Sequence, residues 1–406
     1  MKIAVMMRAI DHDSGFQSYV IGLMNALLGF EDDHRYVLLY RTPRFLGQFA
    51  SSPKVKEILV TAPHKFLWDQ VAVPWHAWRE GVDIIFNPKF SVPFVAHCPV
   101  VMGLQEPAQW AWPEHYEKFD VFYEHLMLPL YCRRAAHLFP MASWILEENR
   151  KHLNLPLPHA TVTWPAPRPE LKPVENPGAL HEYRIRRKLP ERFLLAITRV
   201  DHHGLDGSTS FYPGKNPQVA LQAFLRIRDR IPHHFIFLGR QVREFFQSMG
   251  FDESDMERVH CMGFLPFEEL PSLLSLADAM VHVPFYEGFG FSLMAALACG
   301  CPTLASKTGC CPEVVGDAAL LADPCDPWDV AEKILTILNN PELRQNLRVR
   351  GMQRMNEVTW EKAARLTLEG FKKAVAGHST PKVPAVSRDP GHLAASPDIM
   401  EQDNSN

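Results

Sequence analysis

The segment from Pro284 to Met294 holds the residues best suited to chemistry, because it combines a carboxylate with two closely spaced glycines. Glu287 follows a short apolar run that predicts a strand, and Gly288 and Gly290 allow a tight turn before a helix expected to begin near residue 291. A helix N-terminus offers unpaired backbone N–H groups that suit a phosphate, and α/β folds bind ligands at the carboxyl ends of their strands. The alternative is that Glu287 is a helix-capping or loop acid, because a Gly-x-Gly pair alone is weak evidence for nucleotide binding.

The elements that must position this segment alternate along the whole chain as short apolar runs and longer helical patterns. That alternation predicts an α/β protein with parallel sheets. We expect strands at 3–7, 36–40, 58–61, 84–87, 100–104, 138–141, 161–164, 193–198, 235–238, 259–261, 279–283, 303–305 and 319–321. The expected helices cover 15–28, 66–78, 116–136, 143–153, 216–228, 267–276, 291–299, 327–339, 341–356 and 359–376.

The length of 406 residues exceeds what one ordinary core supports, so two domains are expected. We assign a first Rossmann-like domain to 1–167, a proline-rich linker to 168–190 and a second such domain to 191–358. A last helix over 359–377 precedes a tail, 378–406, whose lack of large apolar residues predicts disorder. Two such domains place a ligand in the cleft between them.

The composition excludes several classes of protein. Apolar residues make up 47% and charged residues 22% of the chain, which excludes disordered and fibrous proteins. A net charge of −4, with no basic excess in either half, argues against nucleic-acid binding. The 8 cysteines have neither a disulfide-scaffold nor a zinc-site spacing, so we expect reduced thiols and no metal. With no signal-peptide pattern or convincing membrane span, a cytoplasmic location is expected.

The wider segment around Glu287 strengthens the nucleotide interpretation. Glu-Gly-Phe-Gly is followed by a helix ending in Ala-Cys-Gly at 298–300, by Pro-Glu-Val-Val-Gly at 312–316 and by Asp-Pro at 323–324. This order and spacing resemble the signature of retaining family 4 (group 1) glycosyltransferases of GT-B fold. The resemblance covers residues 1 to about 376 and is strong over 193–340. It implies two Rossmann-like domains facing each other across a cleft, with the N-terminal domain on the acceptor side. The last helix would return to that domain.

The resemblance also implies roles for particular residues. Arg199 and Lys215 would hold the donor diphosphate, where fixed cations stabilise the charge that develops on the leaving group. Glu287 would contact hydroxyls of the donor sugar. The remaining donor-binding candidates are Gly15, Gly263, Phe264, Leu265, Gly288, Phe289, Gly290, Phe291 and Ser292. Without the resemblance, Arg199 and Lys215 would be interpreted as solvated surface cations.

Two positions depart from the family pattern. Ala295 stands where the family usually has a second Glu that binds the nucleotide ribose, and Gln105 stands where it usually has His near the reacting sugar. Gln105 and the following Glu106 remain candidates for the sugar and acceptor side, because both can hydrogen-bond a hydroxyl group. The departures keep open an alternative, a catalytically impaired pseudo-enzyme of GT-B fold that scaffolds another transferase. A sugar-nucleotide epimerase of the same fold fits the Glu-Gly-Phe-Gly segment less well.

By resemblance, we expect a retaining, metal-independent hexosyltransferase. It would move a sugar from a nucleotide-sugar, which is a substrate rather than a cofactor, to a glycan or lipid-linked acceptor in surface polysaccharide synthesis. Trp68, Trp75 and Trp78 fall on one expected helix. They could make a weak peripheral contact with the inner face of a membrane, or serve core packing instead.

Overall fold

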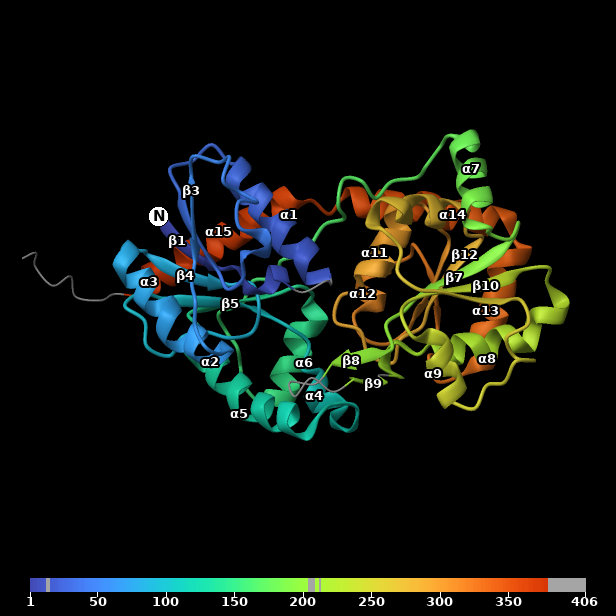
Figure 1. Cartoon of the computed structure of the whole chain (residues 1–406), viewed down its shortest axis with the longest axis horizontal. Helices are drawn as coiled ribbons and strands as arrows, with labels where there is room; N and C mark the ends of the chain where they lie inside the picture. The colour runs from blue at the N-terminus through green and yellow to red at the C-terminus, as the bar shows by residue number, and fades with distance from the viewer. Residues whose placement is uncertain (12–14, 204–208, 212, 379–406) are drawn as a thin grey trace, which may run out of the picture.

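Two parallel six-stranded sheets organise the chain in the computed structural model, which describes residues 1–11, 15–203, 209–211 and 213–378 (Figure 1). The sheets lie in two separate halves, and helices cover them. The tail expected to be disordered lies, apart from His378, outside the described residues.

The first sheet has the strand order β3-β2-β1-β4-β5-β6, with every neighbouring pair parallel. From β1 the chain adds β2 and β3 on one side of the sheet, and then adds β4, β5 and β6 on the other side. The position between β1 and β4 is therefore the topological switch point, where α/β folds bind ligands. The strands are β1 (Lys2–Met6), β2 (Arg35–Tyr40), β3 (Val55–Leu59), β4 (Ile84–Asn87), β5 (Val100–Leu104) and β6 (His137–Pro140).

The helices of this half are α1 (Gly15–Gly29), α2 (Lys65–Leu67), α3 (Val73–Glu80), α4 (Ala108–Ala111), α5 (Lys118–Arg134) and α6 (Ser143–Leu153). Short turns of 3-10 helix lie at η1 (Met7–Asp11), η2 (Pro43–Phe45) and η4 (Pro113–His115). The helix expected over 66–78 is three consecutive pieces, because a π-helical turn, η3 (Trp68–Ala72), joins α2 to α3.

The second sheet repeats the same topology with the order β11-β10-β7-β12-β13-β14. Its strands are β7 (Phe193–Ile197), β10 (His234–Leu238), β11 (Val259–Met262), β12 (Ala279–His282), β13 (Thr303–Ser306) and β14 (Leu320–Ala322). A small antiparallel pair, β8 (Asp201–His203) and β9 (Thr209–Phe211), lies after β7. Two Rossmann-like sheets therefore form the α/β architecture that the sequence predicts.

Helices in and after this half are α7 (Pro177–Arg187), α8 (Pro217–Ile227), α9 (Val242–Ser248), α10 (Leu270–Leu276), α11 (Phe291–Ala298), α12 (Cys311–Val315), α13 (Pro327–Asn339), α14 (Pro341–Asn356) and α15 (Trp360–Gly377). Short 3-10 turns are η5 (Pro213–Lys215), η6 (Arg228–Arg230) and η7 (Phe267–Glu269). The final helix, α15, packs on α1 and β6 of the first half. Its Phe371 lies in that core, with its ring centroid 5.1 Å from that of Phe86 and 5.7 Å from that of Phe139.

Two expectations about local structure were wrong. Residues 161–164 run beside β6, and the N–H groups of Thr161 and Thr163 donate to carbonyl oxygens of that strand. They form no regular strand, because Pro140 of β6 has no N–H to return a bond. The linker holds a full helix, α7, where only irregular chain was expected. Asn176 caps it by accepting bonds from the N–H groups of Gly178 and Ala179, and Pro177 occupies the first turn, where proline is tolerated.

Candidate active site

The loop between β12 and α11 forms the floor of the site. β12 ends at His282, and α11 begins at Phe291 after a turn in which Gly290 has φ = 84°. A left-handed backbone of this kind is unfavourable for residues with a Cβ, which explains the glycine. The first N–H groups of α11 have no acceptor within the helix, and Ser292 of that turn lines a cavity. The turn thus places a helix N-terminus beside the cavity, at the position where the sequence predicts anion binding.

Glu287 and Lys215 form a buried ion pair at the centre of this floor. Lys215 Nζ donates to Glu287 Oε2 at 2.6 Å, and the Glu287 side chain is only 9% exposed. His282 Nε2 lies 3.2 Å from the same oxygen, close enough for an ion pair although its angles do not make a hydrogen bond. Burial alone would raise the pKa of Glu287, but the charges and contacts of Lys215 and His282 outweigh burial and lower the pKa to about 2. Glu287 is therefore a carboxylate, and Lys215 is held in place by it.

A cavity of about 490 Å³ above this pair gathers most of the predicted site residues from both halves of the molecule. Arg199, two residues after β7, lines it together with Lys215. The other predicted residues in its lining are Gly15, Gln105, Glu106, Glu287, Gly288, Phe289, Phe291 and Ser292. Two cations, a carboxylate and a helix N-terminus thus meet at the carboxyl edge of the second sheet.

A second cavity of about 570 Å³ shares Gly15, Phe291 and Ser292 with the first. Phe264 and Leu265, the predicted frame for a base, line this second cavity. Ala295, at the position of the second Glu in the family pattern, lines it as well. Gly263 and Gly290 do not line either cavity, so both can act only through the backbone that they shape.

Sequence reasoning missed several cations in this second cavity. Arg240, Arg44 and Arg168 all line it. Arg240 comes two residues after β10, at the carboxyl edge of the sheet, and its Cζ lies 5.7 Å from the ring centroid of Phe264. Its position directly after a strand was a usable signal, since ligand-binding residues in α/β folds follow strands. Arg44 and Arg168 carried no comparable signal.

Glu106 and Gln105 approach from the first half, directly after β5. The Glu106 carboxylate packs on Gly288, and a Cβ built at that glycine would lie only 2.1 Å from Glu106 Oε2. Burial raises the pKa of Glu106, and the nearby charge of Glu287 adds to this effect. Gln105 Nε2 is buried with no hydrogen-bond partner among the described residues, so it can donate to a ligand hydroxyl.

Direct contacts hold the two halves together around the loop. Glu313 of α12 accepts bonds from the backbone N–H groups of Ser143 and Trp144, both at 2.8 Å, at the start of α6. Its Oε1 also accepts from Trp164 Nε1 at 3.2 Å. A carboxylate at a helix N-terminus is favourable both as a cap and with the helix dipole. Three aromatic pairs add to this contact, Trp112 with Phe285, Trp144 with Tyr286 and Trp164 with Phe289.

The three tryptophans of the expected helix separate in the structure. Trp68 is fully buried and donates from Nε1 to the carbonyl oxygen of Val60 at 2.9 Å. Trp75 and Trp78 are 49% and 65% exposed. Core packing therefore accounts for Trp68 alone. Among the described residues, no group of three or more His, Cys, Asp or Glu side chains has the arrangement to hold a metal ion.

Comparisons with known proteins support this assignment of the fold. Residues 208–354 match the family model described as "Glycosyl transferases group 1". The O-antigen chain mannosyltransferase B of Escherichia coli is 36% identical over 114 residues, which are 28% of this chain and 30% of that protein. The MMP alpha-(1->4)-mannosyltransferase of Mycolicibacterium hassiacum is 34% identical over 122 residues, 29% of this chain and 30% of that protein. The chain thus spans under a third of the length of either relative.

Solved structures match nearly the whole chain. Sucrose-phosphate synthase of Thermosynechococcus elongatus superposes with a TM-score of 0.70 at 18% identity, covering 93% of this chain and 100% of that one. HepE of Anabaena, solved in complex with UDP and glucose, gives a TM-score of 0.68 at 15% identity over 92% and 99% of the two chains. At such identities the likeness concerns the fold. The chain has the GT-B fold, and its C-terminal half matches the group 1 glycosyltransferases.

Proposed function

We propose that this chain is a glycosyltransferase that takes a sugar from a nucleotide-sugar donor bound between the two domains. The observation that carries the proposal is the Lys215–Glu287 ion pair at the N-terminus of α11, with Arg199 lining the same cavity. Relatives named as mannosyltransferases and a structural neighbour that holds UDP and glucose support this choice.

The chemistry follows from the charges at the site. A departing nucleoside diphosphate gains negative charge, and Lys215, Arg199 and the first turn of α11 would stabilise it in the transition state. Glu287 is ionised, so it would accept hydrogen bonds from donor-sugar hydroxyls. Two fixed cations and a helix N-terminus can serve the diphosphate without a metal ion. By family resemblance we propose retention at the anomeric carbon, with the leaving phosphate helping to deprotonate the acceptor.

The acceptor in this proposal is a glycan or lipid-linked glycan of a surface polysaccharide. The name of the E. coli relative, O-antigen chain mannosyltransferase B, supports this class. Gln105 and Glu106 would meet the acceptor, because they come from the N-terminal domain and line the cavity opposite Glu287. The buried, unpaired amide nitrogen of Gln105 would bind a hydroxyl group there.

A peripheral membrane contact in the cytoplasm is the location we propose. In the described part of the chain, no helix is long and apolar enough to cross a bilayer. The side chains of Phe119, Phe122, Leu126 and Leu130 follow one another at three- and four-residue spacings on α5, and they are 40–64% exposed. Such a stripe suits the interface of a bilayer. We expect F119S/F122S to weaken sedimentation with anionic vesicles; unchanged sedimentation would argue for a different role.

A catalytically impaired scaffold is the second candidate, because Ala295 and Gln105 depart from the family pattern. The Lys215–Glu287 pair and Arg199 argue against it, since a scaffold has no use for a phosphate clamp.

The two candidates differ in donor turnover. A panel of nucleotide-sugars is incubated with the full chain, and release of nucleoside diphosphate is measured beside the shift in melting temperature that each diphosphate causes. We expect one diphosphate to raise the melting temperature, and Lys215→Ala to remove the shift. The matched control is Lys151→Gln, a lysine 71% exposed on α6. If no nucleotide-sugar releases a nucleoside diphosphate, and no nucleoside diphosphate shifts the melting temperature, the protein is not such an enzyme.

A further inference from the structure

A third cavity, of about 590 Å³, is lined by residues of the N-terminal domain. Its lining follows the carboxyl ends of strands that neighbour one another in the sheet. Arg8 comes after β1, Arg41 after β2, Thr61 after β3 and Lys89 after β4. Parallel strands bring these ends together beside the switch point between β1 and β4, where α/β folds bind ligands.

Positive charge dominates this cavity. Of the described residues that line it, four are cations, Arg8, Arg41, Lys65 and Lys89, and one is a carboxylate, Asp11. Asp11 Oδ1 already accepts a bond from Thr42 Oγ1 at 2.7 Å. This excess contrasts with the near-neutral charge of the whole chain.

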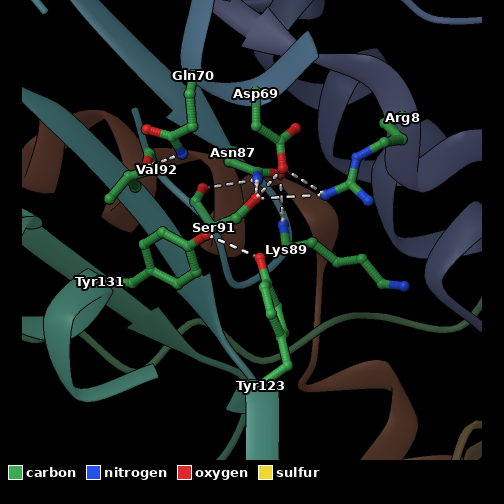
Figure 2. Close-up of polar contacts among 9 residues, drawn as sticks. All are labelled: Arg8, Asp69, Gln70, Asn87, Lys89, Ser91, Val92, Tyr123 and Tyr131. Carbon is green, nitrogen blue, oxygen red and sulfur yellow. Dashed lines mark hydrogen bonds and ion pairs between the residues drawn. The ribbon is translucent and has the colours of Figure 1, made fainter. Parts of the chain in front are cut away.

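Arg8 forms a buried ion pair with Asp69 beside the cavity. Its Nη2 lies 3.4 Å from Asp69 Oδ2 and 3.3 Å from Ser91 Oγ. Ser91 in turn donates to Asp69 at 3.0 Å, and Asn87 Nδ2 donates to Ser91 Oγ at 2.9 Å. Figure 2 shows this network around Arg8 and the Lys89 side chain extending away from it. Buried polar networks of this kind orient a charged group ahead of binding.

The two lysines lack such partners. Within the described residues, neither Lys65 nor Lys89 has a carboxylate at ion-pair distance. Each ammonium faces aromatic rings instead, with Lys65 Nζ 5.7 Å from the ring centroid of Phe90 and Lys89 Nζ 5.6 Å from that of Phe16. Burial, with the charge of Arg8, lowers the pKa of both lysines to about 8. Nearby carboxylates, Glu124 for both lysines, oppose this lowering only in part, so a bound anion would add compensating charge.

A smaller cavity of about 260 Å³ connects this region with the donor site. It shares Lys65, Lys89 and Phe90 with the cationic cavity, and Gln105 and Glu106 with the donor cavity. A ligand can therefore have one end among the lysines and the other beside Glu106, opposite Glu287.

We propose that the cationic cavity binds a phosphate group of the acceptor, held by Arg8, Lys65 and Lys89, so that the acceptor extends from there past Glu106 to the donor sugar. Arginine in a fixed frame and flexible lysines together suit a phosphate ester or diphosphate. The phosphate belongs either to a soluble sugar phosphate or to a lipid diphosphate. The assignment of this ligand as acceptor rests on the proposed function, whereas the binding of phosphate does not.

The test is calorimetric titration of inorganic pyrophosphate into the full chain, after saturation with the nucleoside diphosphate that fills the donor cavity. We expect pyrophosphate to bind, K65Q/K89Q to weaken binding at least tenfold, and the exposed control Lys151→Gln to leave it unchanged. The proposal is overturned if nucleoside diphosphate abolishes pyrophosphate binding, or if K65Q/K89Q binds as the wild type does.

Retained nucleoside diphosphate binding by K65Q/K89Q shows that the variant is folded. If it does not fold, Lys89→Gln alone replaces it, with several-fold weaker binding expected and unchanged binding overturning the proposal. If the wild type binds pyrophosphate through Lys65 and Lys89 but binds no nucleoside diphosphate, then the proposed glycosyl transfer fails while the phosphate site stands.

The source of the phosphate is resolved by competition. A hexose 1-phosphate and vesicles of phosphatidylcholine containing a polyprenyl diphosphate are each tested for displacement of pyrophosphate. Displacement by the sugar phosphate supports a soluble acceptor, and displacement by the vesicles supports a lipid-linked one. Displacement by neither overturns the assignment of the cavity to the acceptor.

Discussion

The two carboxyl edges that meet at the cleft carry their charge differently. In the C-terminal domain, Lys215 is balanced by Glu287 at 2.6 Å before a ligand arrives. In the N-terminal domain, Lys65 and Lys89 are half-buried and have no carboxylate at ion-pair distance within the described residues. In the proposed reaction, the first arrangement would keep a lysine in position for a diphosphate that gains further negative charge as it leaves. The second would favour a ligand that carries its negative charge before it binds, as in the phosphate site proposed above.

Removing Lys215 should give the largest effect in the molecule. Lys215→Ala leaves the Glu287 carboxylate buried beside His282 and removes a cation from the leaving group, so we expect kcat/KM to fall about 100- to 1,000-fold. Steady-state kinetics of donor turnover measures this loss. A greater loss from Lys65→Gln than from Lys215→Ala would reverse the comparison of the two edges.

The contact between the edges is tested at Gly288. The new Cβ of Gly288→Ala would overlap the Glu106 carboxylate, because the two would approach to 2.1 Å. We expect about a tenfold loss of kcat/KM, from overpacking that costs about 1–3 kcal/mol. In G288A/E106A the shorter side chain at position 106 removes this overlap, so we expect part of the lost kcat/KM to return. Additive losses in that double variant would show that the two residues do not contact each other.

Glu313 contributes hydrogen bonds between the two domains. Glu313→Ala removes the acceptor of two backbone N–H groups at the start of α6, at about 1–3 kcal/mol for bonds to a charged group. We expect a larger radius of gyration in small-angle X-ray scattering and a several-fold rise in the KM for donor. Asp317→Asn serves as the control, since Asp317 is 78% exposed and pairs with Arg350 within the same domain. An unchanged radius of gyration would show that the aromatic pairs hold the two domains together without Glu313.

The smallest expected effect is a loss of folding stability at low pH. The pKa of Glu287 lies below its ordinary value, at about 2, so its ionised form stabilises the fold above about pH 4.5. That contribution is lost as the pH falls toward 2. In urea denaturation, the stability advantage of the wild type over Glu287→Gln should therefore shrink between about pH 5 and pH 2. An advantage that grows on acidification would contradict the charge assigned to the pair.

The ends of regular elements were predictable wherever local signals act alone. The strand 279–283 and the helix 291–299 closely match β12 and α11, because a buried strand, a glycine turn and an apolar helix follow directly in the sequence. The helix α7 was missed because Asn176-Pro177-Gly178 also suits a turn, and only the cap formed by Asn176 decides for a helix. The strand expected at 161–164 does not form. Its pattern of residue types suits a strand, but proline in the neighbouring chain lacks the backbone N–H that a sheet needs.

The amino-acid sequence by itself determined the α/β alternation and the loop between β12 and α11, since Glu287 to Ser292 are consecutive and their geometry is local. The roles of the individual site residues remain predictions for the experiments above. Only the tertiary structure decided which distant residues meet. The strand order β3-β2-β1-β4 brings Arg8, Lys65 and Lys89 to one cavity, although they are far apart in the chain. The reason is physical: parallel strands gather their carboxyl ends at one edge, and the order of strands, which no local pattern encodes, chooses the neighbours.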